Sequence, residues 1–187
     1  MKTDVRRFLR GQETKLLVLV PHRDTRLPLR AWSRALLAAG LPGAWSFPRV
    51  APLAVAERPL SAAELADLAR ALREQARAPG GRFAAGPTAL APLPQGPFGG
   101  PVFAFGPSLN AALPCGLAED GLRPVLPVVL GAALVAGPPP EGLPAPPPLF
   151  FRAAALAVMR VRRLPGENAG GIPSVEWLLE SPRWLPR

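Results

Sequence analysis

The sequence predicts a single α+β domain built around a mostly antiparallel sheet. Short apolar runs closed by proline or glycine recur along the chain, a pattern typical of buried strands. Two segments instead carry apolar residues at helical spacing. At 187 residues the chain can bury a core that needs neither disulfides nor a structural metal. Its 49% hydrophobic and 19% charged residues indicate a globular protein rather than a disordered one.

The first three expected elements are a strand, a helix and a second strand. Residues 16–20 form a short apolar run, which predicts a buried strand. Apolar residues near helical spacing predict a helix over residues 29–39. Residues 47–56 are apolar again, but Pro48 and Pro52 cannot donate to a strand ladder. We therefore expect an edge strand or a bulged strand there.

The clearest helix is expected over residues 61–77, because the sequence carries both halves of a capping box. The Ser61 side chain can accept from the backbone three residues on, and Glu64 can reach back to the backbone of Ser61. A turn rich in glycine and proline then joins two expected strands, residues 82–93 and 101–106.

The second half of the chain is expected to hold strands and loops. Residues 107–124 predict a loop, and residues 125–136 predict an apolar strand. The proline-rich stretch 137–148 predicts an extended surface loop. Two last strands are expected over residues 152–163 and 173–180. The resulting order of elements fits a mixed, largely antiparallel α+β domain.

The chain is strongly basic, with 22 Lys and Arg against 13 Asp and Glu, a formal charge of +9. Such a balance predicts an anionic partner, since nucleic-acid affinity comes largely from neutralised phosphates. The alternative is a GC-rich genome that favours Arg codons, because Ala, Gly and Pro are abundant and the arginines are spread along the chain. No apolar run is long enough for a signal peptide or a membrane span, so we expect a cytoplasmic protein without membrane contact.

Few residues are candidates for catalysis. His22 is the sole histidine and follows the first expected strand, where it could contact a ligand or simply be solvated. The segment around Ser108 lacks the second glycine of a nucleophile elbow. Glu119 and Asp120 are adjacent, which does not show two carboxylates converging across a cleft. Cys115 is the single cysteine, and no set of residues suits a metal, so we expect no metal and no cofactor.

Taken in order, the segments resemble the 2′-5′ RNA ligase-like branch of the two-histidine phosphoesterase family. The resemblance rests on order and length rather than on identity. It implies two pseudo-symmetric lobes of mostly antiparallel sheet around a central cleft, with helices on the outer faces. The approximate lobes of this single domain, residues 1–187, would be 14–106 and 107–187, with the C-terminal strands exchanging between them. The segments that carry it are the opening strand and proline, 16–21, the strand and capped helix, 49–73, the strand pair, 83–105, and the closing hairpin, 154–162 with 174–177.

The family's two His-x-Thr motifs are missing at the corresponding positions. The first motif would fall on Val50 and Pro52, and the second on Pro127 and Val129. None of these side chains can carry a proton or offer a hydroxyl to a phosphate. Losing one acid–base group costs roughly 10²–10⁴-fold in rate, and here both groups are replaced. The resemblance therefore implies a protein that does not perform the family's reaction.

What the resemblance leaves is a cleft with an apolar floor between basic rims. One function is non-catalytic binding of RNA ends, nucleotides or another anion. A second is a protein-interaction or scaffold role, with a partner segment docked in the apolar former cleft. A third is an unrecognised hydrolase. The expected ligand-binding residues on the rims are Arg23, Arg26, Arg49, Arg58, Arg123 and His22.

Overall fold

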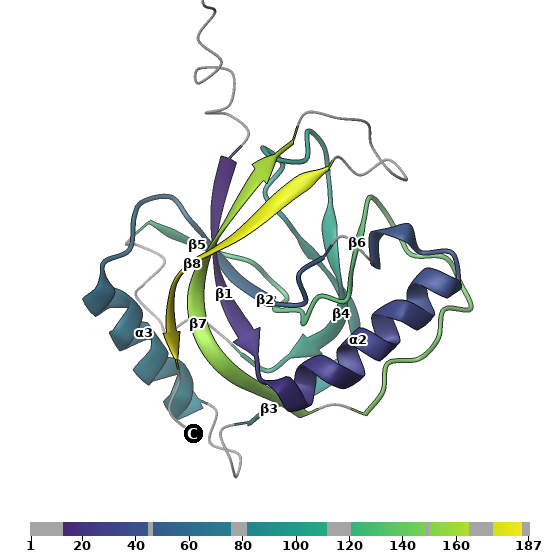
Figure 1. Cartoon of the computed structure of the whole chain (residues 1–187), viewed down its shortest axis with the longest axis horizontal. Helices are drawn as coiled ribbons and strands as arrows, with labels where there is room; N and C mark the ends of the chain where they lie inside the picture. The colour runs from purple at the N-terminus through teal and green to yellow at the C-terminus, as the bar shows by residue number, and fades with distance from the viewer. Residues whose placement is uncertain are drawn as a thin grey trace, which may run out of the picture.

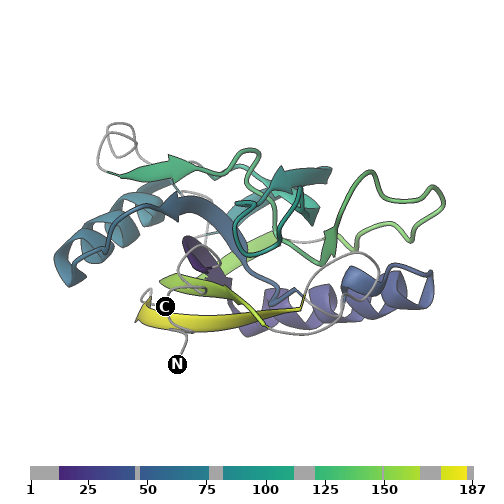
Figure 2. The ribbon, with the colours of Figure 1, turned by 90° about the horizontal axis from the view of Figure 1, so that it is seen from above.

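The computed structural model describes residues 13–44, 47–75, 82–111, 121–148, 150–164 and 174–184. Within these residues the chain is an α+β protein, as predicted, with an antiparallel sheet and helices α2 and α3 (Figure 1). Helix α2 is Arg23–Ala38 and helix α3 is Ala62–Gln75. The two helices lie at opposite ends of the molecule (Figure 2). None of the helices in the described part of the chain is long and apolar enough to cross a membrane.

Strand β7, Phe150–Arg163, organises the sheet because three other strands pair with it. Strand β1, Glu13–Pro21, runs antiparallel to it along most of its length. Strand β3, Arg82–Pro92, pairs with its first three residues, and strand β8, Val175–Trp184, pairs with residues 155–163. Strands β7 and β8 were expected from the sequence over residues 152–163 and 173–180. β7 begins two residues earlier than predicted, and β8 begins two residues later and ends four residues later.

Strand β2, Ala51–Ala56, shows the irregularity that its prolines predict. Leu17 of β1 pairs with Ala54, but the next residue, Val18, pairs with Pro52. Leu53 therefore has no partner in β1. This irregularity is a β-bulge, and it accommodates Pro52, which has no N–H to donate. The alternative of an edge strand is wrong, since strand β5, Leu122–Pro124, pairs with the other side of β2.

The predicted hairpin is formed by β3 and by β4, Phe103–Leu109, whose far side pairs with β6, Ala133–Val135. β5 and β6 are the two ends of the strand path, and they belong to one stretch of chain, residues 122–135. Between them Gly131 N donates to Val50 O, while Leu130 N donates to Pro107 O. This stretch changes partner from β2 to β4, which explains why the strand expected over 125–136 is regular only at its end.

Side-chain caps mark the N-terminal ends of both helices. The two capping-box hydrogen bonds of α3 are confirmed: Glu64 N donates to Ser61 Oγ at 3.2 Å, and Ser61 N donates to Glu64 Oε2 at 2.7 Å. Helix α2 begins at Arg23, six residues before the predicted start. His22 is its N-cap, and Nδ1 of His22 accepts from Asp24 N at 3.3 Å. A capping histidine was not recognised in the sequence, and this error hid the first two turns of α2.

Residues 137–148 form neither helix nor strand, as their proline content predicts. A hydrogen bond joins this segment to helix α2: the indole N–H of Trp32 donates to Pro144 O at 2.8 Å. The loop expected over 107–124 is shortened at both ends by β4 and β5, and residues 112–120 lie outside the described part. Cys115, Glu119 and Asp120 fall in that gap.

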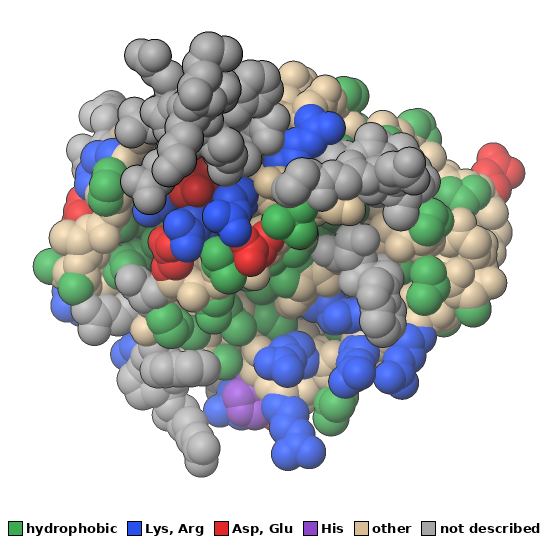
Figure 3. Space-filling view, turned by 45° about the horizontal axis from the view of Figure 1, so that its top comes forward, with side chains coloured by type: hydrophobic (Ala, Val, Ile, Leu, Met, Phe, Trp, Pro, Cys, Tyr) green, Lys and Arg blue, Asp and Glu red, His purple; other side chains and the backbone are tan. Residues whose placement is uncertain are grey.

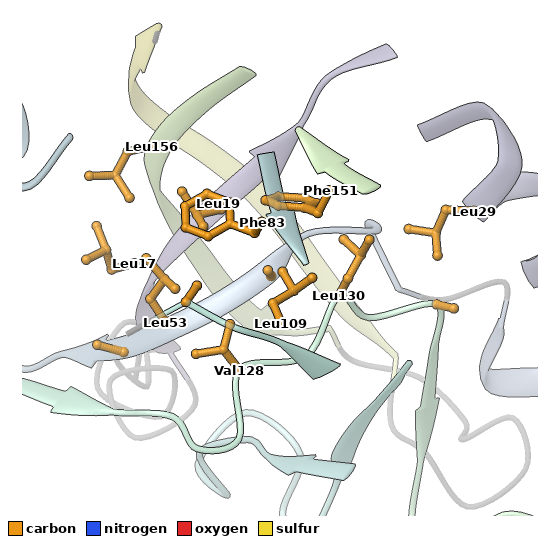
Figure 4. Close-up of a cluster of buried hydrophobic side chains, with 14 of the residues drawn as sticks. Leu17, Leu19, Leu29, Leu53, Phe83, Leu109, Val128, Leu130, Phe151 and Leu156 are labelled. Carbon is orange, nitrogen blue, oxygen red and sulfur yellow. The ribbon is translucent and has the colours of Figure 1, made fainter. Parts of the chain in front are cut away.

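The core continues across the boundary of the two expected lobes. Leu17 and Leu53 from the first half meet Leu130 and Leu156 from the second half in one buried cluster (Figure 4). Both helices bury one face in this cluster, while alternate residues of β1 enter a second cluster on the other side of the sheet. The pseudo-symmetry of the lobes stays a prediction.

We predict that the Glu64→Gln substitution lowers stability at neutral pH but not in strong acid. The hydrogen bond from Arg58, with those from Ser61, lowers the pKa of Glu64 from 4.5 to about 2. A carboxyl whose pKa is lower in the folded state stabilises the fold above its unfolded pKa, and that contribution is lost as pH falls through the folded value. The difference in melting temperature between the two proteins should therefore be constant above pH 4.5 and shrink towards pH 2. A difference independent of pH would contradict the assignment.

Candidate anion-binding site

A pocket opens where the C-terminal end of β1, the outer face of α2 and residues 47–50 meet. These three segments are brought together because β1 and β2 run antiparallel, with Leu19 opposite Ala51. The pocket encloses about 570 Å³, which falls within the range of sites for small molecules. Its lining consists of Val20, Pro21, Arg26, Arg30, Pro48, Arg49 and Val50.

The helical wall of the pocket carries a row of arginines. Arg26, Arg30 and Arg34 follow one another at intervals of four residues, which places them on one face of α2. In Figure 3, Lys and Arg side chains gather over this region, and the acidic side chains visible on that face lie elsewhere. Like charges at this spacing destabilise a helix by a few tenths of a kcal/mol per pair. The row is therefore not explained by helix stability.

Arg49 faces this row from the opposite wall in an unfavourable backbone conformation. Its φ is +60°, the left-handed region that residues with a Cβ seldom adopt. Its Nε donates to Ser33 Oγ at 3.3 Å. Ser33 is 1% exposed, and its hydroxyl lies 3.0 Å from the carbonyl oxygens of both Leu29 and Ala132. A buried hydroxyl thus fixes the Arg49 guanidinium against α2.

The charges in the pocket are close enough to affect one another. Burial lowers the pKa of Arg49, and the positive charges of Arg30, Arg34 and Arg26 lower this pKa further. Arginine remains charged at neutral pH all the same. None of these four guanidinium groups forms an ion pair with a carboxylate of the described residues. The pocket therefore holds a concentrated positive charge that the described part of the chain does not neutralise.

Two arginines of β7 are arranged differently. Arg160 of β7 is paired with both Glu13 and Glu180, and Arg162 is paired with Glu176. Here each cation has an acidic neighbour, and the mixture of red and blue is visible in the upper part of Figure 3. Exposed pairs of this kind contribute about 0–1 kcal/mol each and imply no ligand. Arg82 of β3 and Arg163 of β7 also form no ion pair within the described residues. The candidate site is therefore distinguished by the convergence of several unpaired arginines on one pocket.

The structure brings together two of the six residues expected to bind a ligand, Arg26 and Arg49. Arg30 and Arg34 were missed, although the spacing of four was present in the sequence. Because the helix was expected to begin at residue 29, Arg26 was assigned to a loop and the row was not recognised. A helix beginning at Arg23 would have revealed it.

Arg58 and Arg123 lie at the other end of β2. Arg58 pairs with Glu64, and Arg123 Nε lies 3.5 Å from Glu57 Oε1. Arg49 precedes β2 and Arg58 follows it, and six strand residues span about 17 Å. Arg58 and Arg123 are therefore separate from the pocket, which Arg49 lines.

His22 and Arg23 lie at the start of α2. Nδ1 of His22 is 3.3 Å from Asp24 N and 3.1 Å from Asp24 Oδ2, so the imidazole is engaged with the cap of its own helix. Arg23 is exposed as the first helical residue. Neither residue belongs to the described lining of the pocket.

The four positions of the missing motifs have separate environments. Val50 lines the pocket at 3% exposure, whereas Pro52 is buried within β2. Val129 is completely buried and Pro127 is exposed. The two segments do lie side by side, because Val50 O accepts from Gly131 N at 3.0 Å. An apolar floor is thus present at Val50, while the other three positions lie outside the described lining.

The described lining can bind an anion but offers no group for proton transfer. Arginine does not exchange a proton near neutral pH, and valine and proline have none to give. No group of three or more His, Cys, Asp or Glu residues that could hold a metal occurs in the described ranges. The chain matches no protein-family model, no curated protein and no solved structure in the comparisons with known proteins.

We predict that Arg49→Gly is more stable than Arg49→Ala by about 1 kcal/mol, because a left-handed conformation costs a residue with a Cβ about 1–2 kcal/mol. Both variants lose the hydrogen bond to Ser33, so their difference isolates the backbone. Arg30 within α2 serves as the matched control, where glycine should instead be less stable than alanine by about 1 kcal/mol. Urea unfolding measures all four variants. Equal stability of the two Arg49 variants would exclude backbone strain at this position.

Proposed function

We propose that this chain is a non-catalytic binding protein that takes a phosphate group of an RNA end or a nucleotide in the pocket between α2 and residues 47–50. The observation that carries the proposal is the convergence of Arg26, Arg30 and Arg49 on one pocket without a carboxylate partner among the described residues. Charge-assisted hydrogen bonds to phosphate are the interactions that such a group of guanidiniums is suited to make.

The proposed absence of catalysis rests on two supports. The described lining supplies donors and apolar surface, with no nucleophile and no general base. The resemblance to the two-histidine phosphoesterases, which stays a prediction, points the same way, because Val50 and Pro127 stand where that family has its histidines. A relative that retained phosphate binding after losing proton transfer would combine these features.

The protein-interaction alternative has less support. It requires an apolar surface at the former cleft, but Val129 is completely buried and Val50 is 3% exposed. The more exposed apolar side chains, Leu126 at 63% and Phe150 at 70%, lie on separate segments. The basic pocket is therefore the feature that better accounts for a ligand.

We predict that the protein binds single-stranded RNA with a 2′,3′-cyclic phosphate end, and that this binding weakens steeply with salt. If three phosphates are neutralised, affinity should fall about 20-fold between about 50 mM and 200 mM salt, since the slope for single strands is about −0.7 per phosphate. Fluorescence anisotropy measures the affinity, and chromatography of the recovered RNA should show the cyclic ends intact.

The matched variants for this experiment are Arg30→Gln in the pocket and Arg123→Gln outside it. Loss of one charge-assisted bond, worth about 1.5–3 kcal/mol, should weaken binding by the Arg30 variant at least about 10-fold. The Arg123 variant has the same change in net charge and should bind as the wild type does. Equal weakening by both variants would show that overall charge, rather than the pocket, binds the RNA. Cyclic ends opened by the purified protein would show that it is an enzyme.

A further inference from the structure

We infer that the pocket is selective for a terminal phosphomonoester over a phosphodiester, whether the diester is internal or cyclic. This inference rests on the proposed phosphate-binding function and names the ligand class of the same site. It follows from the number of positive charges in the pocket, from the directions in which they approach, and from the remainder of the lining.

The charge of the pocket exceeds what a diester can neutralise. Arg26, Arg30 and Arg49 line it, and Arg34 lies on the same face of α2. A phosphodiester carries one negative charge, whereas a phosphomonoester carries about 1.5 to 2 at pH 7. The additional charge of the monoester interacts with every guanidinium of the group at once. Arg26 and Arg30 are exposed, but Arg49 is partly buried, which strengthens its part of that interaction relative to one at an open surface.

The arrangement of donors also matches a monoester. A monoester presents three terminal oxygens, and a diester presents two. Arg26 and Arg30 approach from α2, while Arg49 approaches from the segment before β2. The Nε of Arg49 is engaged with Ser33, which leaves the outer nitrogens of that guanidinium for the ligand. Three guanidiniums on two walls can therefore each serve one terminal oxygen.

The rest of the lining is apolar and leaves a place for the uncharged part of the ligand. Val20, Pro21, Pro48 and Val50 carry no charge that would compete for the guanidiniums. A pocket of about 570 Å³ is of a size that accommodates a small molecule or the end of a chain. Val50 and Pro21 are buried, so a ligand with its phosphate among the arginines would rest its sugar or base on the half-buried Val20 and Pro48.

The test compares one short single-stranded RNA with three different 3′ ends: a phosphate, a 2′,3′-cyclic phosphate and a hydroxyl. We expect the 3′-phosphate to bind at least about 10-fold more tightly than the other two. We expect Arg30→Gln to remove most of this preference and Arg123→Gln to retain it. Circular dichroism of each variant confirms that it is folded, so that a loss of binding reports on the site.

Competition with AMP and with the methyl ester of AMP tests the same preference on a small ligand. The ester differs by one methyl group and one charge, and we expect it to compete at least about 10-fold more weakly. A 3′-phosphate RNA that binds more tightly than AMP would identify an RNA end as the source of the monoester. Equal binding would identify a free nucleotide.

The outcomes separate this inference from the proposed function. Equal, salt-sensitive binding of the three RNA ends would overturn the monoester preference and leave the phosphate-binding function standing. No salt-sensitive binding of any end or of AMP would overturn both. Tighter binding of a phosphoserine peptide than of the RNA or AMP would overturn the nucleotide class of the ligand.

Discussion

The pairing of β7 with three other strands is the constraint on which the rest of the structure depends. The whole of β1 lies against one side of β7, and β2 in turn lies against β1. This pairing fixes the end of β1 beside the start of β2. Helix α2 follows β1 after a single residue, and residues 47–50 lead into β2. The two walls of the basic pocket therefore meet as a direct consequence of how the sheet is assembled.

The pocket carries features that reduce stability and that the fold itself does not require. Arg26, Arg30 and Arg34 repel one another along α2, and Arg49 adopts a left-handed backbone with its guanidinium partly buried. Unfavourable features of this kind are concentrated at functional sites, where the surrounding structure holds them in place. Here Ser33 supplies that support through its hydrogen bond with Arg49. An anion in the pocket would relieve the repulsion and stabilise the folded state by an amount that grows with the logarithm of its concentration above the Kd.

Local chemistry could be predicted from the sequence, whereas the site depends on pairings that the sequence does not show. The capping box of Ser61 and Glu64 and the irregularity at Pro52 follow from the bonding capacity of single residues, and both are confirmed. Arg58 was grouped with Arg49 on the strength of the suggested cleft, but β2 holds the two at its opposite ends. The row of arginines on α2 was hidden by one unrecognised cap.

The most direct test of the basic pocket is a crystal structure of the protein grown with tungstate, a dianion of tetrahedral shape whose metal is located by anomalous scattering. Our account predicts a tungsten peak among the guanidiniums of Arg26, Arg30 and Arg49, and no such peak in crystals of Arg49→Gly. A wild-type crystal without a peak in this pocket, or with the anion bound beside Arg58 and Arg123 instead, would contradict it.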